Sequence, residues 1–150
     1  MRVFRPALLL ACGIMLLAAC SPSEPRHPEE PALRSFLERY FSTWSAKNIE
    51  GYGACFHSSA RITFVDKGGE SASQGLTDFL HSQKLSHAQS AYPMSEVPTD
   101  ITISGDSRIA QAAVRWKLTK GAETVTGTDY FTLVKSPAGW RIIALAFYND

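Results

Sequence analysis

The sequence predicts an α+β domain in which helices cover the concave face of one curved antiparallel sheet. Three observations carry this prediction. Apolar residues first recur at helical spacing, and the spacing then changes to the alternation that is typical of strands. The alternating segments follow one another at hairpin distances. Short runs rich in glycine, serine and proline separate them, as expected for turns.

Three helices are predicted before residue 93. The first begins near Pro31, where a missing N–H is tolerated. Its apolar stripe consists of Leu33, Phe36, Leu37, Tyr40, Phe41 and Trp44. Asn48 is placed to cap a second, short helix. The third starts near Leu76, with Ser73 as its expected cap, and ends before Pro93.

The remaining segments predict strands. They cover residues 60–66, 101–104, 109–120, 123–135 and 140–148. The segment 101–104 carries a weak pattern, whereas 109–120 alternates strictly. The last segment is apolar on both sides, which favours a position in the middle of the sheet.

The N-terminus predicts export and anchoring. Residues 1–19 combine a basic start with an uncharged run that is too short to span a bilayer, which needs about 20 residues. The run ends in LLAAC (16–20), which resembles the lipobox of bacterial lipoproteins. The resemblance implies cleavage before Cys20, with diacylglycerol on its thiol and an acyl chain such as palmitate on its amine. An ordinary secretory signal is the alternative.

The domain boundaries follow from this signal. Residues 20–31 form a lipidated, proline-rich tether, and residues 32–150 form the folded domain. The lipids predict attachment to the cell envelope. By the same resemblance, Ser21 favours the outer membrane, with the domain facing the periplasm.

Composition excludes several classes of function. The net charge of +1 argues against nucleic acid as a partner, because that needs a basic surplus. We expect Cys12 to be removed with the signal peptide and Cys20 to carry lipid, which leaves Cys55 alone. We therefore expect Cys55 to be a buried thiol and the domain to have no disulfide. The four histidines show no ligand spacing, so we expect no metal and no cofactor.

Three stretches of the domain resemble the NTF2-like superfamily, the cone-shaped fold shared by ketosteroid isomerase, scytalone dehydratase and SnoaL-type cyclases. They are residues 36–66, 75–80 and 127–148. The resemblance implies a curved antiparallel sheet with three helices on its concave face, enclosing a pocket. The superfamily contains enzymes, binding proteins and adaptors, so the resemblance is specific for fold and not for function.

Asp129 is the most informative residue of the predicted domain. It shares its strand face with Val125, Phe131 and Leu133, which places a carboxyl where apolar side chains are buried. Burial should raise its pKa unless a donor pairs with it. It is therefore either a polar group in a pocket or a structural carboxyl held by a tyrosine hydroxyl or tryptophan N–H. The expected pocket residues are Tyr40, Trp44, Phe64, Trp116, Asp129 and Phe131. These aromatic rings either line a cavity or fill the cone as a solid core.

The resemblance to ketosteroid isomerase weakens a catalytic interpretation. It places the oxyanion-hole tyrosine and aspartate of that enzyme on Tyr40 and Asp129, but its catalytic base falls on Phe64, which cannot accept a proton. Asp66, two residues further, is the remaining candidate base, and turn formation is the alternative for it. The only catalytic candidates are therefore Tyr40, Asp129 and Asp66, none of them strong.

We therefore expect a non-catalytic lipoprotein that binds a small apolar or amphipathic ligand. The alternatives are an adaptor that recognises a protein with its sheet face, and an isomerase, dehydratase or hydrolase. We also expect a homodimer, because the outward face of one strand carries Thr124, Thr126, Thr128, Tyr130 and Thr132, and short β-branched side chains pack well against a second sheet.

Overall fold

The computed structural model describes residues 27–150. The predicted signal peptide 1–19, Cys20 and most of the predicted tether lie outside the described residues. Within residues 27–31, His27 is buried and its ring packs edge-on against Trp140, with centroids 5.7 Å apart. The chain is thus already packed on the domain at residue 27.

Three helices form where the apolar spacing predicts them. They are α1 (Glu30–Ser45), α2 (Ile49–Gly53) and α3 (Leu76–Gln89). The whole predicted stripe of α1 is buried. Asn48 caps α2, its Oδ1 accepting a hydrogen bond from the Gly51 N–H at 2.9 Å.

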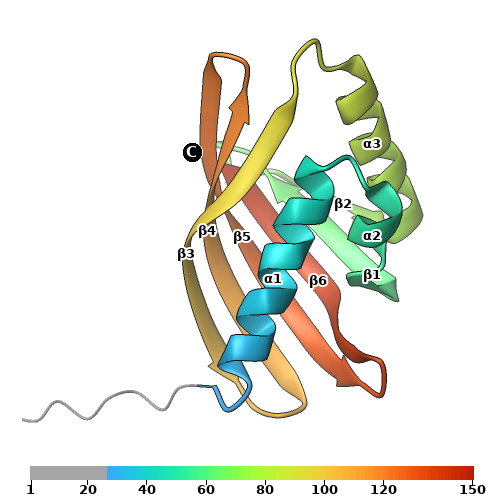
Figure 1. Ribbon diagram of the computed structural model, residues 1–150, viewed down its shortest axis with the longest axis vertical. Coiled ribbons are helices and arrows are strands. Elements are labelled where there is room, and N and C mark those ends of the chain that lie inside the picture. The colour runs from blue at the N-terminus through green and yellow to red at the C-terminus, as the bar shows by residue number, and fades with distance from the viewer. Residues whose placement is uncertain (1–26) are drawn as a thin grey trace, which may run out of the picture.

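Six strands form a single sheet among the described residues. They are β1 (Phe56–Val65), β2 (Ser71–Gly75), β3 (Met94–Gly105), β4 (Ile109–Lys120), β5 (Glu123–Ser136) and β6 (Gly139–Asn149). Their order across the sheet is β2-β1-β6-β5-β4-β3 (Figure 1). β6 lies in the interior of the sheet, as its apolar sequence predicts. Neighbouring strands are antiparallel except β1 and β6, which run parallel.

Strand β2 differs from the sequence prediction. Ser73 does not cap α3 but lies within β2, where its hydroxyl is 2.6 Å from that of Thr63 on β1. Gly75 is the residue before α3, and it supplies no side-chain cap. The segment 71–75 has no apolar alternation, so its strand conformation depends on pairing with β1 at the edge of the sheet.

Two other strands are longer than their sequence patterns suggest. β1 begins at Phe56 and β3 at Met94, instead of residues 60 and 101. The register of β3 against β4 shifts between Pro98 and Asp100, which is a β-bulge at Thr99. Pro98 and this bulge interrupt the alternation that would have identified the first half of β3.

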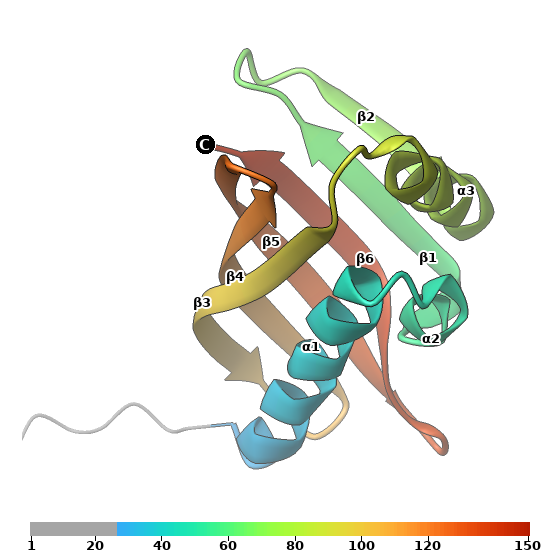
Figure 2. The ribbon, with the colours of Figure 1, turned by 45° about the horizontal axis from the view of Figure 1, so that its top comes forward.

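All three helices lie on the same side of the sheet, as Figure 2 shows, and the core lies between the two layers. Cys55 is fully buried there and is a free thiol. The outer face of the sheet has no helix over it in residues 27–150. No helix in this part of the chain has the length and apolar character needed to cross a bilayer.

Candidate ligand-binding site

A cavity of about 140 Å³ lies between the helices and the concave face of the sheet. Half of the residues that line it are aromatic: Tyr40, Trp44, Tyr52, Phe79, Trp116 and Phe147. Four polar side chains also reach it: Gln83, Glu96, Asp129 and Asn149. The cone is therefore not filled completely by its aromatic core.

Asp129 lies on the inward face of β5 and is only 4% exposed. Its Oδ1 accepts a hydrogen bond from Nε1 of Trp116 on β4 at 2.8 Å. Burial raises the pKa of Asp129 to about 7, although hydrogen bonding from Trp116 and Tyr40 acts in the opposite direction. This carboxyl therefore faces a cavity and also has an indole partner.

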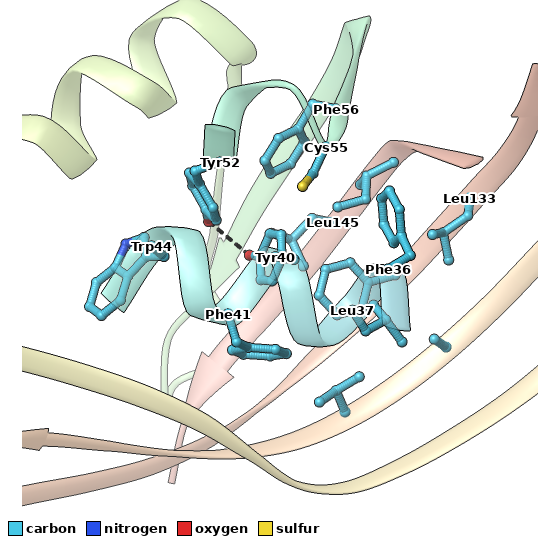
Figure 3. Close-up of a cluster of buried hydrophobic side chains, with 14 of the residues drawn as sticks. Phe36, Leu37, Tyr40, Phe41, Trp44, Tyr52, Cys55, Phe56, Leu133 and Leu145 are labelled. Atoms are coloured by element: carbon cyan, nitrogen blue, oxygen red, sulfur yellow. Dashed lines mark hydrogen bonds between the residues drawn. The ribbon is translucent and has the colours of Figure 1, made fainter. Parts of the chain in front are cut away.

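Two tyrosine hydroxyls lie next to this carboxyl. The hydroxyl of Tyr52, from α2, donates to that of Tyr40, from α1, at 2.8 Å (Figure 3). Burial raises the pKa of both tyrosines well above the ordinary value, so both stay neutral. The pair can donate or accept a hydrogen bond without adding charge.

Glu96 is the site residue that sequence analysis missed. It lies on β3 and is partly buried beside the same cavity. Burial and the charge of Asp129 raise the pKa of Glu96 to about 8. Ser45, at the end of α1, fixes its backbone: the Ser45 hydroxyl donates to the Glu96 carbonyl at 3.0 Å and accepts from its N–H at 2.9 Å. The sequence signal that could have identified Glu96 is the alternation of Met94, Glu96 and Pro98, which places all three on the inward face of β3.

Trp44 and α3 form the remaining wall. The indole N–H of Trp44 donates to Oε1 of Gln83 on α3 at 2.8 Å. Behind Trp44, the His87 ring lies with its centroid 4.4 Å away and is buried. Neither of its nitrogens has a hydrogen-bond partner in the described part of the chain. Burial and the charge of Lys47 lower the pKa of His87, so the ring is neutral.

The structure brings four of the predicted pocket residues together: Tyr40, Trp44, Trp116 and Asp129. Phe131 is buried beneath Tyr40, edge-on at 5.1 Å, and does not reach the cavity. Phe64 is 36% exposed and packs against Phe147, which lines the cavity in its place. Asp66 is exposed and accepts hydrogen bonds from the N–H groups of Gly68 and Glu70, so it closes a turn.

The chemistry of the site is that of two carboxyls in an aromatic enclosure. Both titrate near neutral pH, so the pair can hold or release a proton there. No group of three or more histidine, cysteine or acidic side chains is placed to hold a metal ion within residues 27–150.

Comparisons with known proteins agree on the fold. A family model described as "Putative lumazine-binding" matches residues 28–148. An NTF2-like protein of unknown function from Pseudomonas putida superposes with a TM-score of 0.69 at 13% identity, covering 79% of this chain and 84% of that one. A protein of unknown function with a cystatin-like fold from Nostoc punctiforme superposes with a TM-score of 0.65 at 14% identity, covering 81% of this chain and 90% of that chain.

A third solved structure carries a functional name. The protein called "Putative Scytalone Dehydratase" from Novosphingobium aromaticivorans superposes with a TM-score of 0.67 at 16% identity, covering 81% of this chain and 84% of that chain. No curated protein sequence matches this chain. At these identities the structural likeness concerns the fold alone. The match of the family model over residues 28–148 shows that this chain belongs to the family described as "Putative lumazine-binding".

Proposed function

We propose that this domain binds a small, largely apolar ligand with one polar end in the cavity between α1, α3 and the sheet. The observation that carries the proposal is a buried, hydrogen-bonded carboxyl, Asp129, in a cavity lined mainly by aromatic and leucine side chains. Ligand pockets typically combine apolar walls with a few convergent polar groups. The aromatic wall supplies the contact area, and Asp129 with Glu96 fixes the orientation of the polar end.

The size of the cavity limits the ligand. Its volume of about 140 Å³ is below the roughly 300 Å³ at which pockets for drug-sized molecules begin. An apolar protein cavity of about 150 Å³ accommodates benzene. The part of the ligand inside the cavity is therefore about one ring or a short branched chain, and anything larger extends toward the exposed lining residue Asn149.

The proposal is tested by ligand titrations of the domain 27–150. Trp44 and Trp116 both line the cavity, so tryptophan fluorescence reports on occupancy once the remote Trp140 is replaced by phenylalanine. The probes are toluene and phenol, which match in size and differ in polarity, and lumazine, which the family description names. We expect saturable binding that Leu145→Trp abolishes by filling the cavity. Tyr130→Ala, on the outer face, is the matched control. Absence of binding by every probe would contradict the proposal.

Catalysis is the second candidate, and Glu96 is the observation that favours it. Two carboxyls that titrate near neutral pH beside one cavity are suited to transferring a proton as acid and base. Glu96 supplies a proton acceptor that Phe64 lacks. The test is isomerisation of cyclohex-3-enone to its conjugated isomer, followed by absorbance. A rate that Glu96→Gln abolishes, while the apolar probe toluene still binds as tightly as before, would support catalysis.

We also propose that a second copy of this chain covers the outer face of the sheet. A depression of about 500 Å³ is lined mostly by alanine, serine and threonine side chains of β1 and β3 to β6, together with larger side chains that include Arg61, Gln111 and Tyr130. Tyr130 is 51% exposed there. Recognition of a different protein by this face is the adaptor alternative.

Finally, we propose that the chain is a lipoprotein anchored through Cys20 in the bacterial outer membrane and facing the periplasm. The support is the LLAAC sequence after a short apolar run. Mass spectrometry of the membrane fraction should detect three acyl chains on an N-terminal Cys20, and Cys20→Ala should leave the precursor uncleaved. A mature N-terminus without acyl mass would contradict this anchoring.

A further inference from the structure

The cavity has a one-sided charge pattern. Two acidic side chains, Glu96 and Asp129, line it beside the aromatic rings, together with the neutral amides of Gln83 and Asn149. No lysine, arginine or histidine is among the described residues that line it. A site for an anion would need basic side chains instead of acidic ones, so this lining favours a cationic ligand over an anionic one.

We propose that the polar end of the ligand is a small organic cation, an alkylammonium or quaternary ammonium group, held by the aromatic wall and the two carboxyls. This inference rests on the proposed function and names the class of its ligand.

The aromatic wall supplies the first half of the recognition. A cation over the face of a tryptophan or tyrosine ring is attracted by the ring quadrupole, and cages of such rings are a recurring way to bind quaternary ammonium groups. Here Trp44, Trp116, Tyr40 and Tyr52 all line one cavity. A trimethylammonium head is no larger than the benzene-sized guest that this volume admits.

The carboxyl pair supplies the second half. Without a ligand, burial keeps the pair partly protonated near neutral pH, because two adjacent negative charges are unfavourable where little water reaches them. An ammonium group takes the role of that proton, since an opposite charge nearby favours the ionised carboxylate. Binding therefore releases protons and becomes tighter as the pH rises through the titration range of the pair.

Other titratable groups around the pair do not offset this effect. Tyr40 and Tyr52, facing it from α1 and α2, stay neutral because burial raises the pKa of each. From α3, His87 lies behind Trp44 and is also neutral, since burial lowers its pKa. The cavity residues of β4 and β6 are uncharged.

The test compares choline with 3,3-dimethylbutan-1-ol, its uncharged isostere, by calorimetric titration of the domain 27–150 below and above neutral pH. We expect choline to bind at least tenfold more tightly than the alcohol at high pH. We expect its affinity to rise by up to about tenfold per pH unit for each proton released. Glu96→Gln and Asp129→Asn should weaken choline binding and reduce this pH dependence. Asp100→Asn, which removes an exposed acid from the same strand as Glu96, is the matched control.

The possible results separate this inference from the proposed function. If the alcohol binds as tightly as choline, or if the affinity for choline does not change with pH, the proposal that the ligand carries a cationic group is wrong. That proposal is also wrong if neither choline nor the alcohol binds while toluene or phenol does. In each of these cases the proposed small-ligand site is still supported. If none of the compounds binds, both proposals fail. Since the pH dependence is measured on the unmodified sequence, the test does not depend on whether the variants fold.

Discussion

Asp129 and Trp116 depend on each other at the scale of single residues. The carboxyl is buried, and the indole N–H donates to it at 2.8 Å. A buried donor without an acceptor costs about 1–3 kcal/mol, which exceeds the net gain from a typical hydrogen bond. Removal of one partner is therefore more damaging than replacement by a side chain of the same shape that still accepts.

This argument predicts different costs for two substitutions of Asp129. Asp129→Asn retains an oxygen acceptor for Trp116, so we expect the free energy of unfolding to change by less than about 1 kcal/mol. Asp129→Leu leaves the indole N–H unpaired and should cost about 1–3 kcal/mol. Urea denaturation at a pH of about 4 or below, where the carboxyl is protonated in the unfolded as well as the folded state, measures both without a contribution from proton binding. In the Trp116→Phe background the Leu substitution should cost less, and equal stability of the Asn and Leu variants would contradict the prediction.

The two carboxyls also predict a pH dependence of stability. Their pKa values are raised in the folded protein, to about 8 for Glu96 and about 7 for Asp129, whereas unfolded carboxyls titrate near pH 4. Between these limits the folded state binds more protons than the unfolded state, so stability falls as the pH rises. A group that is protonated only when folded contributes a loss of about 1.4 kcal/mol per pH unit.

The comparison that isolates this effect is with the variant carrying Glu96→Gln and Asp129→Asn. His87, whose pKa is lowered, has the opposite influence at acidic pH, but it is present in both proteins and cancels in the difference. We expect the wild type to lose stability relative to the variant from about pH 4 to pH 8, measured by denaturation at a series of pH values. A difference that is independent of pH would refute this account.

At the scale of elements, the predictable parts were those with long, regular patterns. The stripe of α1 and the alternation of β4 and β5 follow directly from burial of one face, and this placed Tyr40, Trp44, Trp116 and Asp129 at one cavity. β2 was not predictable because it carries no apolar pattern and depends on its neighbour. Glu96 was hidden because Pro98 and the bulge interrupt the pattern of β3. Phe64 was expected in the pocket, but it packs against Phe147, and it is Phe147 that lines the cavity.

The packing of β4 against β5 at Gly127 provides a test at this scale. A Cβ atom at this position would lie 2.3 Å from Cζ2 of Trp116 and 2.3 Å from the Tyr148 carbonyl oxygen. We therefore expect Gly127→Ala to displace the indole from Asp129 and to destabilise the domain by about 1–3 kcal/mol. Denaturation and tryptophan fluorescence measure the two effects.

Gly75→Ala is the control for this substitution. Gly75 has an extended backbone, and its Cβ would meet only Nη1 of Arg61, at 3.9 Å. We expect this variant to keep the fluorescence of the wild type and to lose much less stability. If Gly127→Ala is as stable as Gly75→Ala, the close approach of Trp116 to β5 is not what holds the indole against Asp129.

At the scale of the molecule, the cavity lies far from the point where the chain enters the domain. α1 begins at Glu30 and lines the cavity with Tyr40 and Trp44, both in the second half of the helix. A helix of 16 residues is about 24 Å long. The cavity therefore lies toward the end of α1 that is remote from the start of the described chain.

The uncovered outer face of the sheet leads to the prediction of a dimer. Six strands about 4.8 Å apart span about 24 Å, and eight residues along a strand add about 27 Å, or roughly 650 Å² of projected area. Side-chain relief increases the accessible area toward the roughly 800 Å² per partner of a stable interface. Tyr130 lies on this face, and exposed tyrosines often dominate the binding energy of such interfaces.

We therefore expect the domain 27–150 to be a dimer at micromolar concentration, and Tyr130→Lys to raise its dissociation constant at least about tenfold by placing a charge in the interface. Sedimentation velocity measures both. Leu85→Lys is the control, because Leu85 is 44% exposed, comparable to 51% for Tyr130, but lies on α3 at the helical side of the sheet. A wild type that sediments as a monomer at high micromolar concentration would exclude the dimer. Equal weakening by both lysines would place the interface elsewhere and leave the outer face available to a different protein.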